Sequence, residues 1–411
     1  MHLFVSKFDS KHMKLKVTSF LFFFVIAFNV YSQNGESYFI YHKTDTVKQV
    51  DLIDYFRKIF KPKTEIDNNN KRKVQFSLFP TESNFADGRA LVTTFNATFL
   101  MGDKTDTNVS NVYFIPYITF TGKYGFELYP TIWLKKNSWN FIGEYFILNY
   151  PQDTWGLGGN TPDSNKTLID YRQIRAHQST LKGIFPNLAV GLGYQYDRHY
   201  DISIPDNTSA VDSLRVDVVN NVSVSAGLVL PIVFDSRKNT LNAQQGFYGS
   251  FNYRYNSTFF GSDTNWSSVF IDLRKYFPIK STRSVLAFRS YYWSIVSGKV
   301  PYLDLPSNNW EPASGTSSRG IEQNRYRSNA NVYFESEYRY VITDNGLIGG
   351  VLFANVVSAS QYNTQNFEYW HPAAGFGFRV KFNKYTDVNV DLDFGFSKDY
   401  FTVYLNIGEM F

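Results

Sequence analysis

Alternation of apolar and polar residues runs through most of this chain and restricts its fold more than any other feature. In the stretch DVNVDLDFGF, residues 387–396, every second position is apolar, and the positions between are polar or glycine. The stretches LVTTFNATFLM (91–101) and NVYFESEYRY (331–340) show a similar period of two. This is the period of a β-strand whose two faces meet different surroundings.

Segments of this kind recur from about residue 73 to the end, separated by turns or polar loops. We expect strands to begin near residues 73, 89, 110, 124, 139, 166, 185, 214, 245, 264, 283, 328, 345, 370, 387 and 399. Sixteen is an even number, as bacterial transmembrane barrels require, and a mean spacing of about 21 residues leaves room for a strand with its turn or loop. No helical period separates the segments, which disfavours βαβ folds.

The aromatic content separates two all-β interpretations. Aromatics make up 18% of the chain, whereas charged residues are only 19%. A soluble sandwich or propeller would carry dense Lys and Glu on its polar face. Here aromatics gather near many expected strand ends, as in the girdles of membrane barrels: Tyr117 and Phe120, Trp133, Tyr145 and Phe146, Tyr291 to Trp293, and Tyr400 and Phe401. We therefore predict a transmembrane antiparallel β-barrel of about sixteen strands over residues 73–411.

The first 32 residues resemble an export signal. Lys14 and Lys16 precede the apolar stretch FLFFFVIAFNVY, and the small Ser32 follows it. We expect cleavage there, with the mature chain starting near residue 33 and Met13 as an alternative start. An uncleaved single anchor is the alternative, but the apolar core is short for a spanning helix, which needs about 20 residues.

Charge and residue content limit the possible functions. Residues 1–32 carry +3 of the net charge of +5, so no basic nucleic-acid domain remains. The absence of cysteine excludes a disulfide framework and a thiolate metal site. The six histidines have no ligand spacing, and no phosphate loop is present. We expect neither an enzyme nor a cofactor, although His177 or His199 could in principle serve a hydrolase.

Residues 33–72 differ from the rest of the chain. An amphipathic helix is expected over 47–61, with Val47, Val50 and Ile53 on one face, followed by a polar linker. The helix could be a small packing element, a plug, or an interfacial helix whose basic end meets lipid headgroups.

Several stretches, taken in order, resemble the bacterial surface antigen family of BamA- and TamA-like outer-membrane assembly proteins. They are DTWGLGGNTPD (153–163), FDSRKNTLNAQQGFYGSFNYRY (234–255), IDLRKYFPI (271–279), SSRGIEQNRYRSNANVYFESEYRY (317–340) and DFGFSKDYFTVYLNIGEMF (393–411). The resemblance covers about residues 75–411. It implies a sixteen-stranded barrel whose first and last strands pair weakly, in the outer membrane of a Gram-negative bacterium.

The same resemblance implies a lid loop, folded into the lumen, that carries an Arg-Gly motif. Here the motif is Arg319 and Gly320. An arginine in a partly dry lumen needs acceptors, and the candidate acceptors on expected lumen faces are Glu335, Glu337, Asp391 and Asp393. The alternative is an arginine solvated in an extracellular loop.

The sequence departs from the family pattern in three places. Ile321 follows the Arg-Gly motif where the family has an aromatic, and Asn355 occupies the place of an Asp, so the lid anchor is expected to differ or be weaker. The roughly forty residues before the barrel are too few for a POTRA module. No Gly-x-Ser-x-Gly of a patatin-like domain is present.

The final strand, FTVYLNIGEMF, is expected to turn Val403, Leu405 and Phe411 toward lipid. By resemblance, Tyr404 and Phe411 form the targeting signal read by the assembly machinery, and Phe411 becomes a girdle residue afterwards. Glu409 shares the face of Phe411, and its carboxylate would stay wet at the membrane rim.

Two functions remain open from the sequence. The first is a barrel-only factor that assists insertion or translocation of proteins or lipids. The second is a passive pore or a structural barrel subunit of a larger complex. The expected partners are outer-membrane lipid, the assembly machinery during biogenesis, and a periplasmic or outer-membrane protein.

Overall fold

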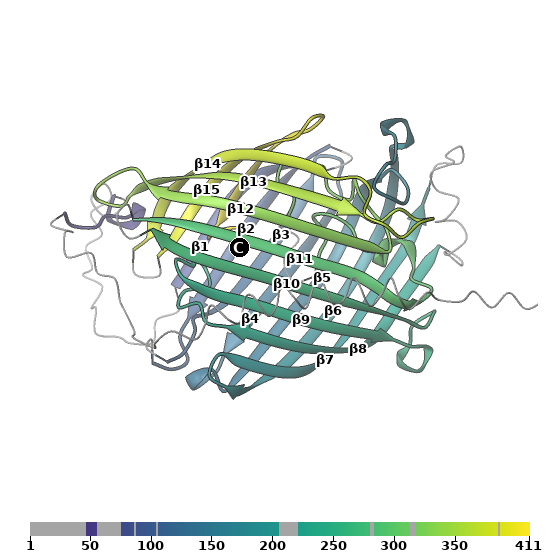
Figure 1. Ribbon diagram of the computed structural model, residues 1–411, viewed down its shortest axis with the longest axis horizontal. Coiled ribbons are helices and arrows are strands. Elements are labelled where there is room, and N and C mark those ends of the chain that lie inside the picture. Colours follow the sequence, from purple (N-terminus) through teal and green to yellow (C-terminus); the bar gives the residue numbers. More distant parts are fainter. Residues whose placement is uncertain are drawn as a thin grey trace, which may run out of the picture. The chain divides into compact units, whose positions relative to one another are not determined.

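The sixteen expected strands are present and form one antiparallel sheet in chain order (Figure 1). The computed structural model describes residues 47–55, 75–85, 88–103, 106–204, 221–279, 283–312, 317–384 and 387–411. The strands are β1 Gln75–Phe85, β2 Gly88–Phe99, β3 Ser110–Thr119, β4 Tyr124–Trp133, β5 Trp139–Thr154, β6 Thr167–Phe185, β7 Leu188–Ser203, β8 Val222–Asp235, β9 Gly246–Asn256, β10 Trp266–Ile279, β11 Ser284–Gly298, β12 Ala330–Val341, β13 Ile348–Ala359, β14 His371–Asn383, β15 Val388–Phe396 and β16 Phe401–Ile407.

The fold prediction is confirmed, including the barrel, the strand number and the lid loop folded into the lumen. Fifteen of the sixteen expected starts lie within three residues of the observed ones. The remaining expected start, residue 214, lies outside the described residues, and β8 is described from Val222. Each strand pairs with the next along the chain, so every connection is a hairpin turn or a loop.

The alternation assigns the two faces of the sheet as expected. On β12, Tyr333, Glu335 and Glu337 are buried, whereas Phe334 between them is 47% exposed. On the outer face, Phe376 of β14 stacks on Phe394 of β15 with ring centroids 5.2 Å apart. The outer face is therefore apolar and aromatic, and polar and charged side chains line the lumen.

The girdle assignment of the aromatics is only partly right. Phe120 and Phe401 are exposed, at 66% and 53%. Several others point into the lumen and are buried there: Tyr117, Trp133, Phe146, Tyr291 and Trp293. They sit at inward positions of their strands, and all but Trp133 pack in clusters that include lid residues. For example, Tyr291 and Trp293 form a cluster with Ile321 of the lid.

The described part of the N-terminal segment is attached to the connections that follow β12 and β14. The Val50 amide donates to the Asn345 carbonyl at 3.1 Å. Lys384 donates from its backbone to Asp51 at 2.9 Å and from its ammonium to Asp54 at 2.6 Å. Residues 52–55 are helical, whereas residues 47–51, which were also expected to be helical, are not. Residues 56–61 of the expected helix and the expected signal over 1–32 lie outside the described residues. None of the described helices has the length and apolar character that crossing a membrane requires.

The first and last strands are the two ends of the strand order. β1 pairs with β2, and β16 pairs with β15 over seven residue pairs. Within the described residues, β1 and β16 do not pair with each other. The sheet thus has a seam, which we define as the junction between β1 and β16.

The outward position of Leu352, in the middle of β13 and 52% exposed, gives a test of the membrane-facing surface. We expect Leu352→Arg to destabilise the barrel in lipid by about 2–4 kcal/mol, because a charge at mid-depth must leave water. Urea titration of the lipid-embedded protein, followed by its electrophoretic shift, measures this. Phe259→Arg is the control, because Phe259 lies in the β9–β10 connection and is 86% exposed. Equal stability of both variants would contradict an apolar outer surface in lipid.

Candidate functional site in the lumen

The lid is the connection between β11 and β12, described over residues 299–312 and 317–329, and these described parts fold back into the lumen. Its first part is held by apolar packing, because Tyr302, Leu303 and Leu305 form a buried cluster with Tyr171 and Trp266 of the wall. The Asp304 carboxylate accepts a hydrogen bond from the Ser225 hydroxyl at 2.7 Å. The lid is therefore attached to the β6–β10 side of the wall before it reaches the Arg-Gly motif.

The Arg319 guanidinium lies at the centre of the second attachment and has no exposed surface. Its Nε and Nη2 donate to one Glu335 oxygen at 3.1 and 2.5 Å. Nη1 donates to Asp393 at 2.5 Å, and Nη2 also contacts Glu337. One lid arginine is thus bound by three wall carboxylates, from β12 and β15.

The alternation of the strands explains how these carboxylates converge. Glu335 and Glu337 are two residues apart on β12, so both point inward. Asp393 points inward from β15, and the ring of Phe353 on β13 lies under the guanidinium at 3.7 Å. Charge-assisted hydrogen bonds in a dry site are strong, but losing one partner leaves an uncompensated buried charge. The arrangement therefore favours one docked position of the lid.

Gly320 is required by this docked position for two reasons. Its φ is +90°, a left-handed conformation that side chains disfavour. A Cβ atom at this position would lie 2.6 Å from the Phe396 backbone nitrogen. The neighbour on β15 is also a glycine, because a Cβ on Gly395 would lie 2.6 Å from the Gly320 nitrogen. The lid backbone thus lies directly on the backbone of β15.

Both departures from the family motif have a structural role. Asn355 donates from its side chain to the Arg319 carbonyl at 2.9 Å, so it binds the lid backbone and not the guanidinium. Ile321 is buried against Tyr291, Tyr333 and Val357 in the place of the expected aromatic. Arg319 binds three carboxylates, so it has anionic partners even though Asn355 replaces the expected Asp.

The other sequence-predicted residues have different positions. Asp391 was expected as an acceptor for Arg319 but instead lies 3.2 Å from Nε of Arg379. Asp391 lies two residues before Asp393, closer to the start of β15. Tyr404 is opposite Asp393 in the β15–β16 pairing.

Phe411 and Glu409 contradict the expectation for the final strand. Phe411 is only 3% exposed and lies inside the barrel, not in an outer girdle. The Glu409 carboxylate is buried with Arg379 and Arg339 instead of remaining wet at a rim. The reason is that β16 ends at Ile407, so the period of two no longer applies to the residues after it.

Sequence reasoning missed the two wall arginines and a further lid contact. Arg339 and Arg379 both occupy inward positions and bind the acids around Arg319. In the lid, Glu311 accepts from Arg289 at 3.3 Å, and Arg289 also contacts Asp272 at 3.2 Å. The strand period places these arginines on the inward face of the sheet. It does not identify their partners, which lie on distant strands.

Among the described residues, a metal site would need a cluster of ligands, and a hydrolase site would need partners for His177 or His199. No group of three His, Cys, Asp or Glu residues there is arranged to hold a metal ion. His177 contacts Asp197 at 2.7 Å through Nε2, and its Nδ1 and both ring nitrogens of His199 have no hydrogen-bond partner. Neither histidine among the described residues is therefore paired with a serine hydroxyl, as a serine triad requires.

Comparison with solved structures shows which known proteins share this fold. A BamA from Haemophilus ducreyi lacking POTRA domains 1–3 matches with a TM-score of 0.52 and 14% identity, over 84% of this chain and 74% of that one. CdiB from Acinetobacter baumannii matches with a TM-score of 0.51 and 10% identity, over 82% of this chain and 65% of that one. CdiB from Escherichia coli matches with a TM-score of 0.53 and 9% identity, over 83% of this chain and 67% of that one. No protein-family model and no curated protein matches the sequence. The chain has the fold of a BamA-like barrel.

A pair of glycine substitutions tests whether the docked lid depends on Gly320. We expect Gly320→Ala to displace the lid, because the added methyl group meets the β15 backbone. Gly122→Ala is the matched control, since Gly122 has φ +87° and open space around its Cβ position. In each variant the alanine must adopt a left-handed backbone conformation, which costs roughly 1–2 kcal/mol. Only in Gly320→Ala does the new methyl group also clash with the β15 backbone. Limited trypsin digestion reports the result, with faster cleavage after Arg319, Arg325 and Arg327 expected only for Gly320→Ala. Equal cleavage of both variants would argue against the docked geometry.

Proposed function

We propose that this protein is an outer-membrane barrel of a Gram-negative bacterium that assists the insertion or translocation of proteins, or of lipids, at that membrane. The observation that carries the proposal is the seam, where β1 and β16 do not pair within the described residues. In lipid, unpaired strand edges lose several kcal/mol per unsatisfied backbone group. Such an edge is suited to transient pairing with the strand of another chain.

The position of the lid supports this proposal over a passive pore. The lid attaches to β6–β10 on one side and to β12 and β15 on the other, so it crosses the lumen. Its Arg-Gly motif is fixed on β15, the strand that carries β16 at the seam. A lid in this place can move when the strands at the seam separate. A pore that conducts steadily needs an unobstructed lumen.

The similarity of the fold to BamA and CdiB supports this proposal. We propose in addition that a periplasmic or outer-membrane protein is a partner of the barrel. A protein that copurifies with the barrel from crosslinked membranes would identify it.

Vesicles of bacterial phospholipid that contain the purified barrel test the proposal. We expect a urea-unfolded eight-stranded outer-membrane protein to reach its folded, electrophoretically shifted form severalfold faster than in vesicles with an inert porin. Arg319→Ala is expected to lower this acceleration, because three buried carboxylates lose their shared cation. Arg172→Ala is the matched control, since Arg172 forms an ion pair in which its side chain is 53% exposed.

Two results would overturn the proposal in favour of a passive pore or structural barrel. One is folding of the client at the rate of the porin vesicles. The other is a steady planar-bilayer conductance that Arg319→Ala leaves unchanged. A conductance that is small in the wild type and fluctuates more in Arg319→Ala is what a gated lid predicts.

A further inference from the structure

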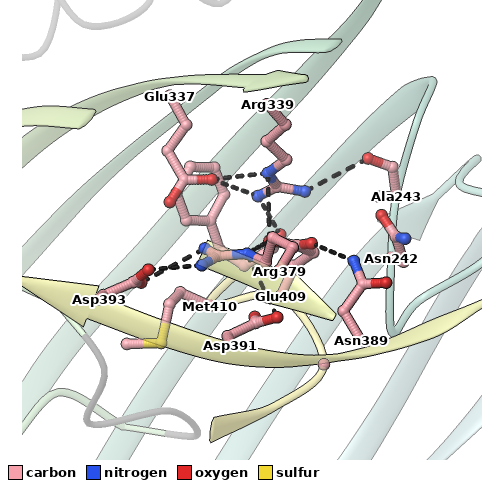
Figure 2. A network of polar contacts seen from close by, with 12 residues as sticks. Asn242, Ala243, Glu337, Arg339, Arg379, Asn389, Asp391, Asp393, Glu409 and Met410 are labelled. Carbon is pink, nitrogen blue, oxygen red and sulfur yellow. Dashed lines mark hydrogen bonds and ion pairs between the residues drawn. The ribbon is translucent and has the colours of Figure 1, made fainter. Parts of the chain in front are cut away.

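The four residues after β16, Gly408–Phe411, turn into the lumen instead of extending the strand. We call this segment the tail. Gly408 has a φ of +92°, which begins the turn. Its amide donates to the Asn389 carbonyl of β15 at 2.9 Å, and the Glu409 amide donates to the Leu241 carbonyl of the β8–β9 connection at 2.9 Å. The tail thus turns away from β16 and contacts both β15 and the β8–β9 connection. Figure 2 shows Glu409 of the tail beside Arg379, Arg339 and Asn389.

The Glu409 carboxylate is held by two arginines and an amide. It accepts from Arg379 Nε at 2.9 Å and from Asn389 Nδ2 at 2.8 Å, and Arg339 Nε lies 3.6 Å away. Burial alone would raise the pKa of this carboxyl, but the charges of Arg379 and Arg339 and the hydrogen bonds lower it to about 2. Glu409 is therefore ionised at any physiological pH.

The end of the tail occupies an aromatic site on the far wall. Met410 and Phe411 are buried with Ala243, Tyr276, Val285 and Ala287. The Phe411 ring lies 6.2 Å from the Tyr276 ring and 5.1 Å from the Arg339 guanidinium. Arg339 also donates from Nη2 to the Phe411 carbonyl at 3.0 Å. The site therefore recognises both the ring and the backbone of this residue.

The arginines that bind the tail also bind the carboxylates that hold the lid. Arg379 contacts Asp393, and Arg339 donates from Nε to Glu337 at 2.7 Å. Asp393 and Glu337 are two of the three carboxylates on Arg319. Six side chains thus form a closed ring of alternating charge, in the order Arg319, Glu337, Arg339, Glu409, Arg379, Asp393.

This ring joins two elements that no strand pairing connects. Arg319 belongs to the lid, and Glu409 belongs to the tail of the strand at the seam. Removing Glu409 would take one partner from each of Arg339 and Arg379, and removing Arg319 would take one from each of Glu337 and Asp393. The wall ions would then compete for their remaining neighbours. The lid and the tail therefore stabilise each other through the wall residues between them.

We propose that the tail is a latch that couples β16 to the lid, so that withdrawal of the tail from its lumen site loosens the lid, and undocking of the lid loosens β16. The latch gives the last strand an anchor besides its strand pairing, which among the described residues is with β15 alone. The coupling rests on the contacts of the tail and would hold whichever function the barrel performs.

Hydrogen–deuterium exchange of the full-length protein in lipid tests the latch. We expect Glu409→Gln to raise amide exchange about tenfold both in β16 (401–407) and in the lid (317–329), because the variant keeps the size of the side chain but removes its charge from the ring. Exchange in β5–β7 should not change. Glu368→Gln is the control, since Glu368 is exposed and its carboxylate only accepts a hydrogen bond from Thr364.

Faster exchange in β16 alone, or in neither segment, would overturn the coupling. Because coupling between two sites is reciprocal, the lid variant Gly320→Ala gives an independent measurement. It should raise exchange in β16 relative to Gly122→Ala, and equal exchange in these two variants would also overturn the proposal. This second pair applies even if Glu409→Gln does not reach a folded barrel.

Discussion

A sheet that crosses a membrane must satisfy every backbone donor and acceptor within the protein, and the rest of this structure depends on that requirement. Fifteen strand pairings satisfy the backbone groups around the wall. At the seam, β1 and β16 do not pair within the described residues, so the requirement is not met there. The fold therefore concentrates its weak point at one place. The lid motif and the tail are both attached close to that place, on β15 and on the arginines around it.

Burying charge in the lumen is expensive unless every ion has partners, and here the partners come from different elements. Arg319 brings a positive charge from the lid, Glu409 brings a negative charge from the tail, and the wall supplies the ions between them. Apolar packing alone would tolerate a small shift of the lid or the tail. A closed set of ion pairs tolerates it much less, because hydrogen bonds lose strength quickly with distance and angle.

The sequence was informative wherever the strand period applied and uninformative where it stopped. The period of two placed Glu335, Glu337 and Asp393 on the lumen face, but periodicity does not say which carboxylate lies at the depth of Arg319. Asp391 has the same parity as Asp393 and binds a different arginine. Phe411 was misplaced because a glycine at position 408 can either continue a strand or turn it, and only the tertiary contacts of the tail decide between the two. Aromatics such as Tyr291 were predicted to lie in the girdles because large aromatic residues near strand ends are typical there. Tyr291 instead packs inside the lumen, against apolar residues of the wall and the lid.

The contact between Gly320 and Gly395 has a consequence for how this protein can change over evolutionary time. Each glycine occupies the space where the other would place a side chain. A substitution at one position cannot be compensated at the other, because both partners already have the smallest possible residue. Lineages that keep the docked lid are therefore confined to glycine at both positions, whereas lineages that lose the lid are released from the constraint at both positions together.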